Sequence, residues 1–360
     1  MSHFHPLTIA SVVPESNSAI ALKFEVPDGL SSTFQFKPGQ YLTLKAKLDG
    51  EEVRRSYSIC SAVQDEGLTV GIKKIDGGQF STHANEQFKP GDTIDVMPPQ
   101  GEMTVELNAS AAKNYLCIAA GSGITPILSI IKSVLIAEPD SQVTLLYGNR
   151  GANTMMFRET LSWIKNAWLE RFLWINIYSR EQQDAEILNG RLNNRKGGEL
   201  NEKLISLQSY DEFYLCGPEG MISEVTRGLR GLGIADSQIH FELFFASAED
   251  AKQAMQRHHE RAAKYAGKVS QVSVRADGRE SMFELTADGE NILDAAMENG
   301  VDLPFSCKGG VCATCKARLL VGKVDMDLHH GLSDEEIDSG YILTCQAHPI
   351  SETVRIDFDQ

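Results

Sequence analysis

The stretch SCKGGVCATC at residues 306–315 decides the fold of the C-terminal part of this chain. It places Cys307, Cys312 and Cys315 in the spacing C-x4-C-x2-C, and Cys345 follows after a long gap. This spacing is typical of a plant-type [2Fe-2S] cluster. Thiolates suit a soft iron–sulfur core, and the two glycines of the stretch let the backbone turn closely around a sulfide. We therefore predict that these four cysteines ligate a [2Fe-2S] cluster.

A structural zinc site is the alternative for the same cysteines. Zinc sites usually repeat a C-x2-C pair on both sides, whereas this chain has one such pair. The cysteine total of seven is odd, and four lie close together, which favours a metal site over a disulfide scaffold. Cys60 and Cys117 are interpreted as small buried hydrophobic residues.

Residues 269–360 around this motif are predicted to contain a strand pair and a short helix, and their resemblance to plant-type ferredoxins implies an α+β ferredoxin-like β-grasp domain. The segment contains 17 Asp and Glu against 7 Lys and Arg, a net charge of −10. Residues 246–268, which precede it, are polar, rich in helix formers and without a clear apolar face. We expect this segment to be a linker.

Residues 1–110 show short alternating apolar runs separated by Gly and Pro pairs, which is typical of an antiparallel β-barrel. On one run, the string Arg55-Ser56-Tyr57-Ser58 points Arg55 and Tyr57 to one side. An arginine can hold a pyrophosphate while a tyrosine ring stacks on a flavin. Further on, Gly77-Gly78-Gln79-Phe80-Ser81 resembles a phosphate site at a helix start. Two phosphate sites favour FAD.

Residues 111–245 alternate between apolar strands and helices, which predicts an α/β doubly wound parallel sheet. The turn Gly121–Pro126 joins the first strand to its helix, where backbone amides can meet a coenzyme pyrophosphate. Pro126 stands where a third glycine of G-x-G-x-x-G would fall, so a standard Rossmann domain is disfavoured. Cys216 ends a strand before Gly217-Pro218, at the edge where such sheets bind ligands.

The residues after the strand at 172–178 indicate whether the coenzyme is NADPH or NADH. Ser179 and Arg180 follow it directly, where an adenosine ribose binds in doubly wound sheets. A hydroxyl and a guanidinium can hold a 2′-phosphate, whereas an acidic residue there selects NADH. We therefore predict NADPH.

The composition excludes several classes. A net charge of −15 argues against nucleic-acid and membrane-surface binding. The longest apolar stretch, 115–131, contains Gly, Ser, Thr and Pro, so we expect no membrane span. The N-terminus lacks a secretory pattern, and we expect a cytoplasmic protein.

Together, these motifs resemble the ferredoxin–NADP reductase superfamily, in the branch that carries a C-terminal ferredoxin. The resemblance covers nearly the whole chain and implies a role for each matching residue. The implied flavin contacts are Arg55, Tyr57, Ser58, Gly78, Gln79 and Ser81, with Ser58 near the reactive N5. The implied coenzyme contacts are Gly121, Gly123, Thr125, Ser179, Arg180 and Cys216. Phe244 is similar to the aromatic that shields the flavin.

By this resemblance, Ser58 and Cys216 are the candidate catalytic residues of a reductase. Electrons would pass from NADPH through FAD and the [2Fe-2S] cluster to a terminal oxygenase component, diiron or similar, that acts on an aryl-CoA. The alternatives are another oxygenase, a hydroxylase or a hybrid-cluster protein as acceptor. A redox-sensing iron–sulfur binding protein is the non-enzyme alternative.

Overall fold

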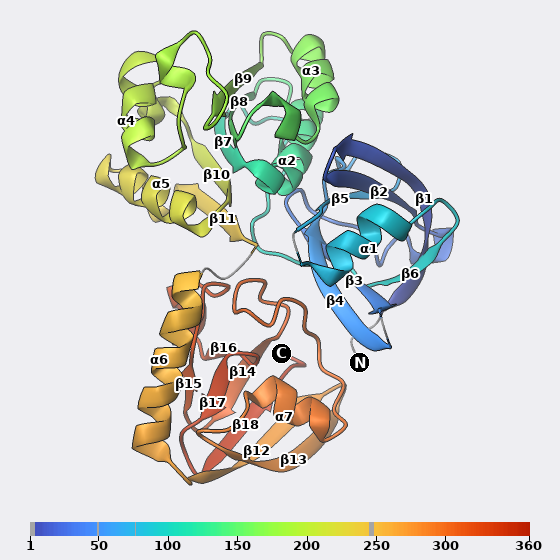
Figure 1. Ribbon diagram of the computed structural model, residues 1–360, viewed down its shortest axis with the longest axis vertical. Helices are drawn as coiled ribbons and strands as arrows, with labels where there is room; N and C mark the ends of the chain where they lie inside the picture. Colours follow the sequence, from blue (N-terminus) through green and yellow to red (C-terminus); the bar gives the residue numbers. More distant parts are fainter. Residues whose placement is uncertain (1–3, 49, 76, 245–247) are drawn as a thin grey trace. The chain divides into compact units, whose positions relative to one another are not determined.

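The computed structural model describes residues 4–48, 50–75, 77–244 and 248–360. The chain divides into two compact units, Phe4–Glu242 and Leu243–Gln360 (Figure 1). Within the described ranges, no helix is both long and apolar enough to cross a membrane.

The first part of unit Phe4–Glu242 is an antiparallel sheet that closes on itself. Its strand order is β4-β3-β6-β1-β2-β5, and an antiparallel bridge between Ile59 and Val70 joins its two ends. Inward side chains such as Leu7 and Ile9 are fully buried, as alternation requires. The predicted barrel is therefore confirmed. Its elements are β1 (His5–Ser16), β2 (Ala19–Glu25), β3 (Tyr41–Leu48), β4 (Glu51–Ser58), β5 (Leu68–Lys73), α1 (Gln79–Gln87), β6 (Thr93–Val96) and a 3-10 turn η1 (Asp28–Leu30).

The second part of this unit is a five-stranded sheet in the order β11-β10-β7-β8-β9. Strands β10, β7, β8 and β9 pair in parallel, which confirms the doubly wound fold. Figure 1 shows α2 and α3 on one face of the sheet and α4 and α5 on the other. Its strands and helices are β7 (Asn114–Ala120), α2 (Ile124–Ala137), β8 (Gln142–Asn149), α3 (Arg158–Ala167), β9 (Phe172–Tyr178), α4 (Asn194–Lys203), β10 (Glu212–Gly217), α5 (Glu219–Gly231) and β11 (Ile239–Leu243). Its 3-10 turns are η2 (Gly121–Gly123), η3 (Ala152–Thr154), η4 (Glu186–Leu188), η5 (Leu207–Ser209) and η6 (Asp236–Gln238).

Helix α2 joins the sheet to the barrel. Most of its residues are buried because one side packs on the sheet and another side contacts the barrel. Ser129 Oγ donates a hydrogen bond to Ser61 O at 2.7 Å, and Ser133 Oγ accepts one from Val63 N at 3.2 Å. The barrel and the sheet therefore form one body in which their facing residues have defined positions.

Unit Leu243–Gln360 contains a mixed sheet in the order β13-β12-β18-β14-β16, and β15 and β17 form a separate two-stranded antiparallel sheet. Strands β12 and β18 are parallel, and the other pairs in this sheet are antiparallel. Helix α7 places its buried residues in the core of the sheet, so the unit has the predicted α+β class. Its elements are α6 (Ala248–Tyr265), β12 (Val269–Ala276), β13 (Arg279–Thr286), α7 (Ile292–Glu298), β14 (Lys316–Val321), β15 (Val324–Met326), α8 (Asp334–Asp338), β16 (Tyr341–Leu343), β17 (Ala347–Pro349) and β18 (Thr353–Asp357).

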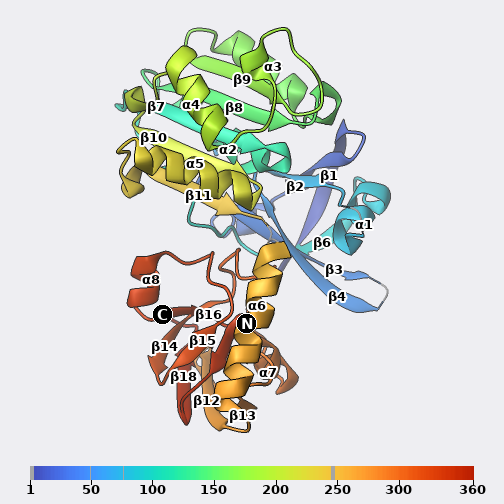
Figure 2. The ribbon, with the colours of Figure 1, turned by 60° about the vertical axis from the view of Figure 1, so that its left-hand side comes forward.

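Of the segment predicted to be a linker, 246–268, the structure describes residues 248–268. Residues 248–265 form α6, which belongs to the same compact unit as the cysteine motif and runs beside β15 (Figures 1 and 2). The cause is Arg261, whose side chain is fully buried and bonds to Asp325 and Asp327. Because the buried contact is an ion pair, no apolar stripe marks it in the sequence.

Candidate functional site

The two predicted flavin strings lie together in the barrel. Tyr57 of β4 and Phe80 of α1 have ring centroids 5.6 Å apart. Tyr57 is half-buried and Arg55, on the same side of β4, is exposed, so both can contact a ligand at the surface. The structure thus brings together the residues predicted to bind the isoalloxazine and the phosphates.

Helix α1 begins at Gln79, directly after Gly78, as predicted. A Cβ at Gly78 would lie 2.6 Å from Ser81 Oγ and 3.1 Å from Ile75 O, so a side chain cannot fit there. Ser81 Oγ also accepts a hydrogen bond from Ile75 N at 3.2 Å. Ser81 therefore stabilises the turn, and Gly78 leaves the helix start open to a phosphate.

The predicted pyrophosphate turn lies where the strand order of the sheet reverses, between β7 and β10. A Cβ at Gly123 would lie 2.1 Å from Cys216 O, so only glycine allows the two loops to approach this closely. Thr125 Oγ1 donates a hydrogen bond to Ser122 O at 3.0 Å and holds the turn. Gly121, Gly123, Thr125 and Cys216 are therefore neighbours at one carboxyl edge.

Two cations that the sequence analysis missed lie at this turn. Lys73, at the end of β5, has its Nζ 3.7 Å from the position of a Cβ on Gly121. Burial, and then the nearby charge of Arg150, lower the pKa of Lys73. Two cations held close together repel each other, and an anion bound between them offsets this repulsion. The pair is therefore suited to binding a coenzyme pyrophosphate. The sequence could not reveal this pair of cations, because Lys73 comes from the barrel and Arg150 follows a strand of the parallel sheet.

A partly buried acid, Glu242, is a further residue that sequence reasoning missed. Ser58 Oγ donates a hydrogen bond to Glu242 Oε2 at 3.2 Å, although the two residues are 184 positions apart. Burial raises the pKa of Glu242 to about 8, while the bond from Ser58 opposes this effect. Glu242 therefore loses its proton at a higher pH than an ordinary carboxyl group does.

The Cys216 side chain is fully buried. Burial, and then the charge of Glu242, raise the pKa of the Cys216 thiol well above its usual value. The predicted catalytic residues Ser58 and Cys216 therefore share an environment with Glu242, and the thiol is neutral there. Phe244 lies two residues beyond Glu242, in the other compact unit, and its predicted role at the flavin stays a prediction.

The predicted coenzyme-selecting residues lie at the carboxyl end of β9. Ser179 N donates a hydrogen bond to Asn149 O, and Arg180 N donates one to Arg150 O, both at 2.9 Å. The side chains of Ser179 and Arg180 are exposed. The adjacent Glu181 accepts a hydrogen bond from Ala152 N at 2.7 Å, so its carboxylate is engaged with the neighbouring turn.

The four predicted cluster ligands come together as two pairs. The thiols of Cys307 and Cys312 are near enough to shift each other's pKa, as are those of Cys315 and Cys345, and Cys307 N donates a hydrogen bond to Cys312 Sγ at 3.5 Å. Cys312 is also close enough to Cys315 to interact with it electrostatically. Two neighbouring thiol pairs fit a cluster of two irons with two thiolates on each.

The backbone of the cysteine loop also fits such a cluster. Lys308, Gly310 and Ala313 have positive φ values of 52°, 73° and 52°, which turn successive amides toward the sulfurs. Gly309 N donates a hydrogen bond to Cys307 Sγ at 3.3 Å. The bond with Cys312, helped by backbone amides and opposed by burial, lowers the pKa of Cys307 to about 6. The loop therefore favours a thiolate at Cys307, whereas the neighbouring thiols and burial raise the pKa of Cys312 and Cys315 well above the usual value.

Comparison with known proteins gives the same three parts. Residues 6–105 match the family described as "Oxidoreductase FAD-binding domain", and residues 117–227 match "Oxidoreductase NAD-binding domain". Residues 274–349 match "2Fe-2S iron-sulfur cluster binding domain". A chain with these three domains is an NAD(P)H-dependent flavin and iron–sulfur oxidoreductase.

Relatives match the chain over its full length. It is 44% identical over 359 residues to one of the subunits of the 1,2-phenylacetyl-CoA epoxidase of Escherichia coli (strain K12), covering 100% of this chain and 99% of the relative. It is 30% identical to the ferredoxin reductase component of 3-ketosteroid-9-alpha-monooxygenase from Rhodococcus rhodochrous, over 98% and 96% of the two chains. The chain belongs to the ferredoxin–NADP reductase superfamily, in the branch with a C-terminal [2Fe-2S] ferredoxin domain.

A solved structure has the same fold. Phthalate dioxygenase reductase, described as a modular structure for electron transfer from pyridine nucleotides to [2Fe-2S], matches with a TM-score of 0.60 and 23% identity. The match covers 99% of this chain and 98% of that one.

Proposed function

We propose that this chain is the reductase component of an oxygenase system that epoxidises an aryl-CoA such as phenylacetyl-CoA. The observation that carries the proposal is the 44% identity, over the full length, to a component of the phenylacetyl-CoA epoxidase. The acceptor is then a terminal oxygenase component with a diiron centre. Because electrons leave through the [2Fe-2S] domain, the acidity of residues 269–360 suits a basic docking surface on that component.

The residues of unit Phe4–Glu242 carry out the first half of the reaction in this proposal. Lys73 and Arg150 would hold the coenzyme pyrophosphate at the Gly121 turn, and Cys216 would lie behind the nicotinamide site as a buried neutral thiol. Ser58, held by Glu242, would lie near the flavin N5. FAD supplies the conversion of a hydride into single electrons, which the [2Fe-2S] cluster passes on.

NADPH is the proposed coenzyme. Ser179 and Arg180 are exposed at the carboxyl edge of the sheet, where they can hydrogen-bond a 2′-phosphate. The carboxylate of Glu181, which would repel that phosphate, is engaged with Ala152 N. We also propose a cytoplasmic location, because reducing conditions keep cluster cysteines as free thiols.

A reductase for a different oxygenase, such as the 3-ketosteroid monooxygenase, is the second candidate, supported by the 30% identity noted above. Epoxidation driven by purified components distinguishes the two candidates. The loaded reductase is mixed with NADPH and the catalytic component of either oxygenase system, and product formation is measured against a reaction without reductase.

We expect NADPH-dependent product with the epoxidase and little with the ketosteroid oxygenase. The opposite preference would overturn the assignment of the acceptor. Failure to reduce an artificial dye with NADPH or NADH, in a protein that holds flavin and cluster, would favour the redox-sensor alternative instead.

A further inference from the structure

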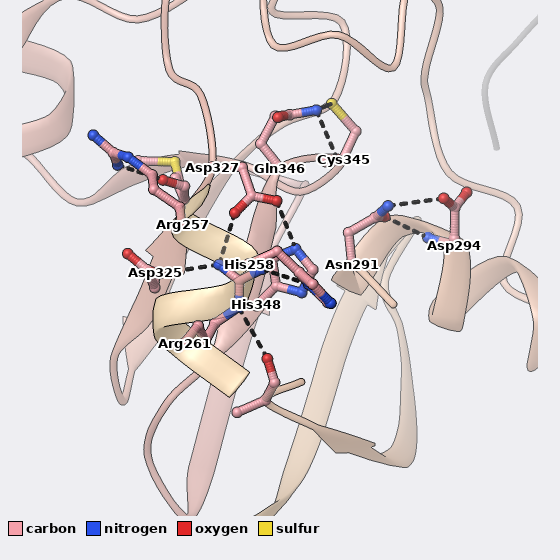
Figure 3. A network of polar contacts seen from close by, with 12 residues as sticks. Arg257, His258, Arg261, Asn291, Asp294, Asp325, Asp327, Cys345, Gln346 and His348 are labelled. Atoms are coloured by element: carbon pink, nitrogen blue, oxygen red, sulfur yellow. Dashed lines mark hydrogen bonds and ion pairs between the residues drawn. The ribbon is translucent and has the colours of Figure 1, made fainter. Parts of the chain in front are cut away.

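The side chain of Gln346 joins the two chain segments that carry the cluster cysteines, and Figure 3 shows it beside Cys345. It is 8% exposed. Its Nε2 donates a hydrogen bond to Lys308 O at 2.9 Å, next to Cys307, and lies 3.0 Å from Cys345 O. The same nitrogen lies 3.8 Å from Cys345 Sγ. One amide group therefore contacts both sides of the cysteine site.

The chemistry of these partners fixes the orientation of the amide. Lys308 O and Cys345 O are both acceptors, so the NH2 group of Gln346 must face them, and a flipped amide would place its oxygen against two carbonyls. Two N–H bonds then serve three acceptors. At least one N–H must therefore serve two acceptors, and Cys345 Sγ is one of the three acceptors within reach.

The aliphatic part of Gln346 also packs against the loop. A Cβ at Gly310, where φ is +73°, would lie 3.0 Å from Gln346 Cγ and 3.0 Å from Leu328 Cβ. The space beside this glycine is therefore already filled by two neighbours. Gln346 and the loop fit each other closely, which keeps the amide in one position.

A polar network holds Gln346 from the other side. Asp327 N donates a hydrogen bond to Gln346 O at 2.9 Å. The carboxylate of Asp327 contacts Arg261 Nη1 at 2.7 Å through one oxygen and His348 Nε2 at 3.2 Å through the other (Figure 3). Both oxygens of Asp327 are thus occupied, so its backbone, and with it Gln346, has little freedom to move.

We propose that Gln346 is a positioning residue that locks the 306–315 loop onto Cys345 and raises the reduction potential of the cluster through its N–H near Cys345 Sγ. Hydrogen bonds to cluster sulfurs favour the reduced form, because reduction adds negative charge that the N–H dipole stabilises. The inference rests on the [2Fe-2S] assignment within the proposed function.

The test replaces Gln346 by methionine in the full-length protein loaded with flavin and cluster. Methionine keeps an unbranched side chain of similar length for packing at Gly310 but has no N–H. The matched control is Gln271→Met, in the exposed β12 position of the same unit, where Nε2 contacts only the exposed Glu284 in the described residues. The readout is the midpoint potential from a redox titration followed by EPR.

We expect Gln346→Met to lower the reduced-to-oxidised ratio at a fixed potential about threefold to tenfold. At 59 mV for a tenfold change this is a fall of about 30 to 60 mV. Gln271→Met should leave the midpoint unchanged. A purely structural role would speed cluster loss without moving the midpoint. An unchanged midpoint in Gln346→Met with two irons bound would overturn the proposal.

A measurement on the wild-type protein covers the case in which Gln346→Met loses its cluster. Glutamine labelled with ¹⁵N only in the side chain is incorporated, and pulsed EPR of the reduced cluster is recorded. We expect a coupled side-chain nitrogen, and its absence would overturn the proposal without any variant. A protein that binds stoichiometric zinc and no iron would instead refute the cluster assignment itself.

Discussion

Replacing Arg261 of α6 by methionine should destabilise unit Leu243–Gln360 selectively. The Arg261 side chain is fully buried. Its Nη1 lies 3.0 Å from Asp325 Oδ2 and 2.7 Å from Asp327 Oδ1, and its Nε donates a hydrogen bond to Ala287 O at 3.0 Å. Methionine keeps the apolar stem but leaves two carboxylates without their cation.

The magnitude follows from the exposure of these partners. Removing one member of a buried ion pair costs about 3 to 5 kcal/mol. Asp325 is 37% exposed, and its side chain can return to water, whereas Asp327 is 15% exposed and cannot do so fully. We therefore expect a loss of about 3 kcal/mol in the free energy of unfolding, at the lower end of that range. For a unit of this size this corresponds to a fall of about 12 °C in Tm.

Two optical signals separate the units in one experiment. Thermal unfolding of the loaded protein is followed by the visible circular dichroism of the cluster, which reports unit Leu243–Gln360. Flavin fluorescence reports unit Phe4–Glu242. The matched control is Arg257→Met on the same helix, because Arg257 is exposed and donates to Met326 O at 2.7 Å. This control should change stability by about 0.5 kcal/mol or less.

Equal shifts of the cluster signal in Arg261→Met and Arg257→Met would refute the reasoning, because burial would then make no difference. A shift of the flavin signal alone would show that α6 supports the other unit.

Four further predictions concern the binding sites and the acidic domain. Arg180→Ala should lower kcat/KM for NADPH about tenfold or more, which corresponds to about 1.5 to 3 kcal/mol, with little change for NADH. Equal losses for both coenzymes would show that Arg180 does not recognise the 2′-phosphate. Cys345→Ser should lose the cluster but keep NADPH-driven reduction of dyes that accept electrons from flavin, and loss of both would contradict independent folding of the units. Because the pKa of Glu242 is raised to about 8, the pH profile of kcat/KM should show an ionisation near pH 8 in the wild type, and Glu242→Gln should abolish it; an identical profile in the variant would assign that ionisation elsewhere. Added salt should slow electron transfer to the oxygenase, because residues 269–360 carry a charge of −10; a rate independent of salt would mean that the acidity serves solubility alone.

The depressed pKa of Asp327 gives the ion pair at Arg261 a pH dependence. Burial opposes ionisation, but the hydrogen bonds from His348 and Arg261 outweigh it and hold the pKa of Asp327 below 3.8. A carboxyl whose folded-state pKa is lowered stabilises the fold fully above its unfolded pKa and loses that contribution as the pH falls through the folded value. The stabilisation is therefore complete at neutral pH, where the Arg261→Met measurement is made.

Sequence patterns predicted the parts of the molecule that are determined by residues close together in the chain. The cysteine spacing identifies the 306–315 loop because ligands of one cluster must lie within reach of each other along a short backbone. Strand alternation and the turn at Gly121–Pro126 likewise predicted the barrel and the doubly wound sheet. The linker prediction rested on the lack of an apolar face, whereas α6 is attached through the charged Arg261.

The missed residues are those whose chemistry depends on a distant partner. Glu242 is an ordinary acid in the sequence, and its high pKa arises only because folding buries it beside Ser58. In the same way, Lys73 becomes a pyrophosphate candidate only where β5 reaches the Gly121 turn. Gln346 adjoins a cluster cysteine in the sequence, yet its reach to Lys308 O depends on how the two segments pack. Motifs can therefore name the groups that bind, whereas the protonation state and redox potential of those groups depend on tertiary contacts, where substitutions outside the motifs should act.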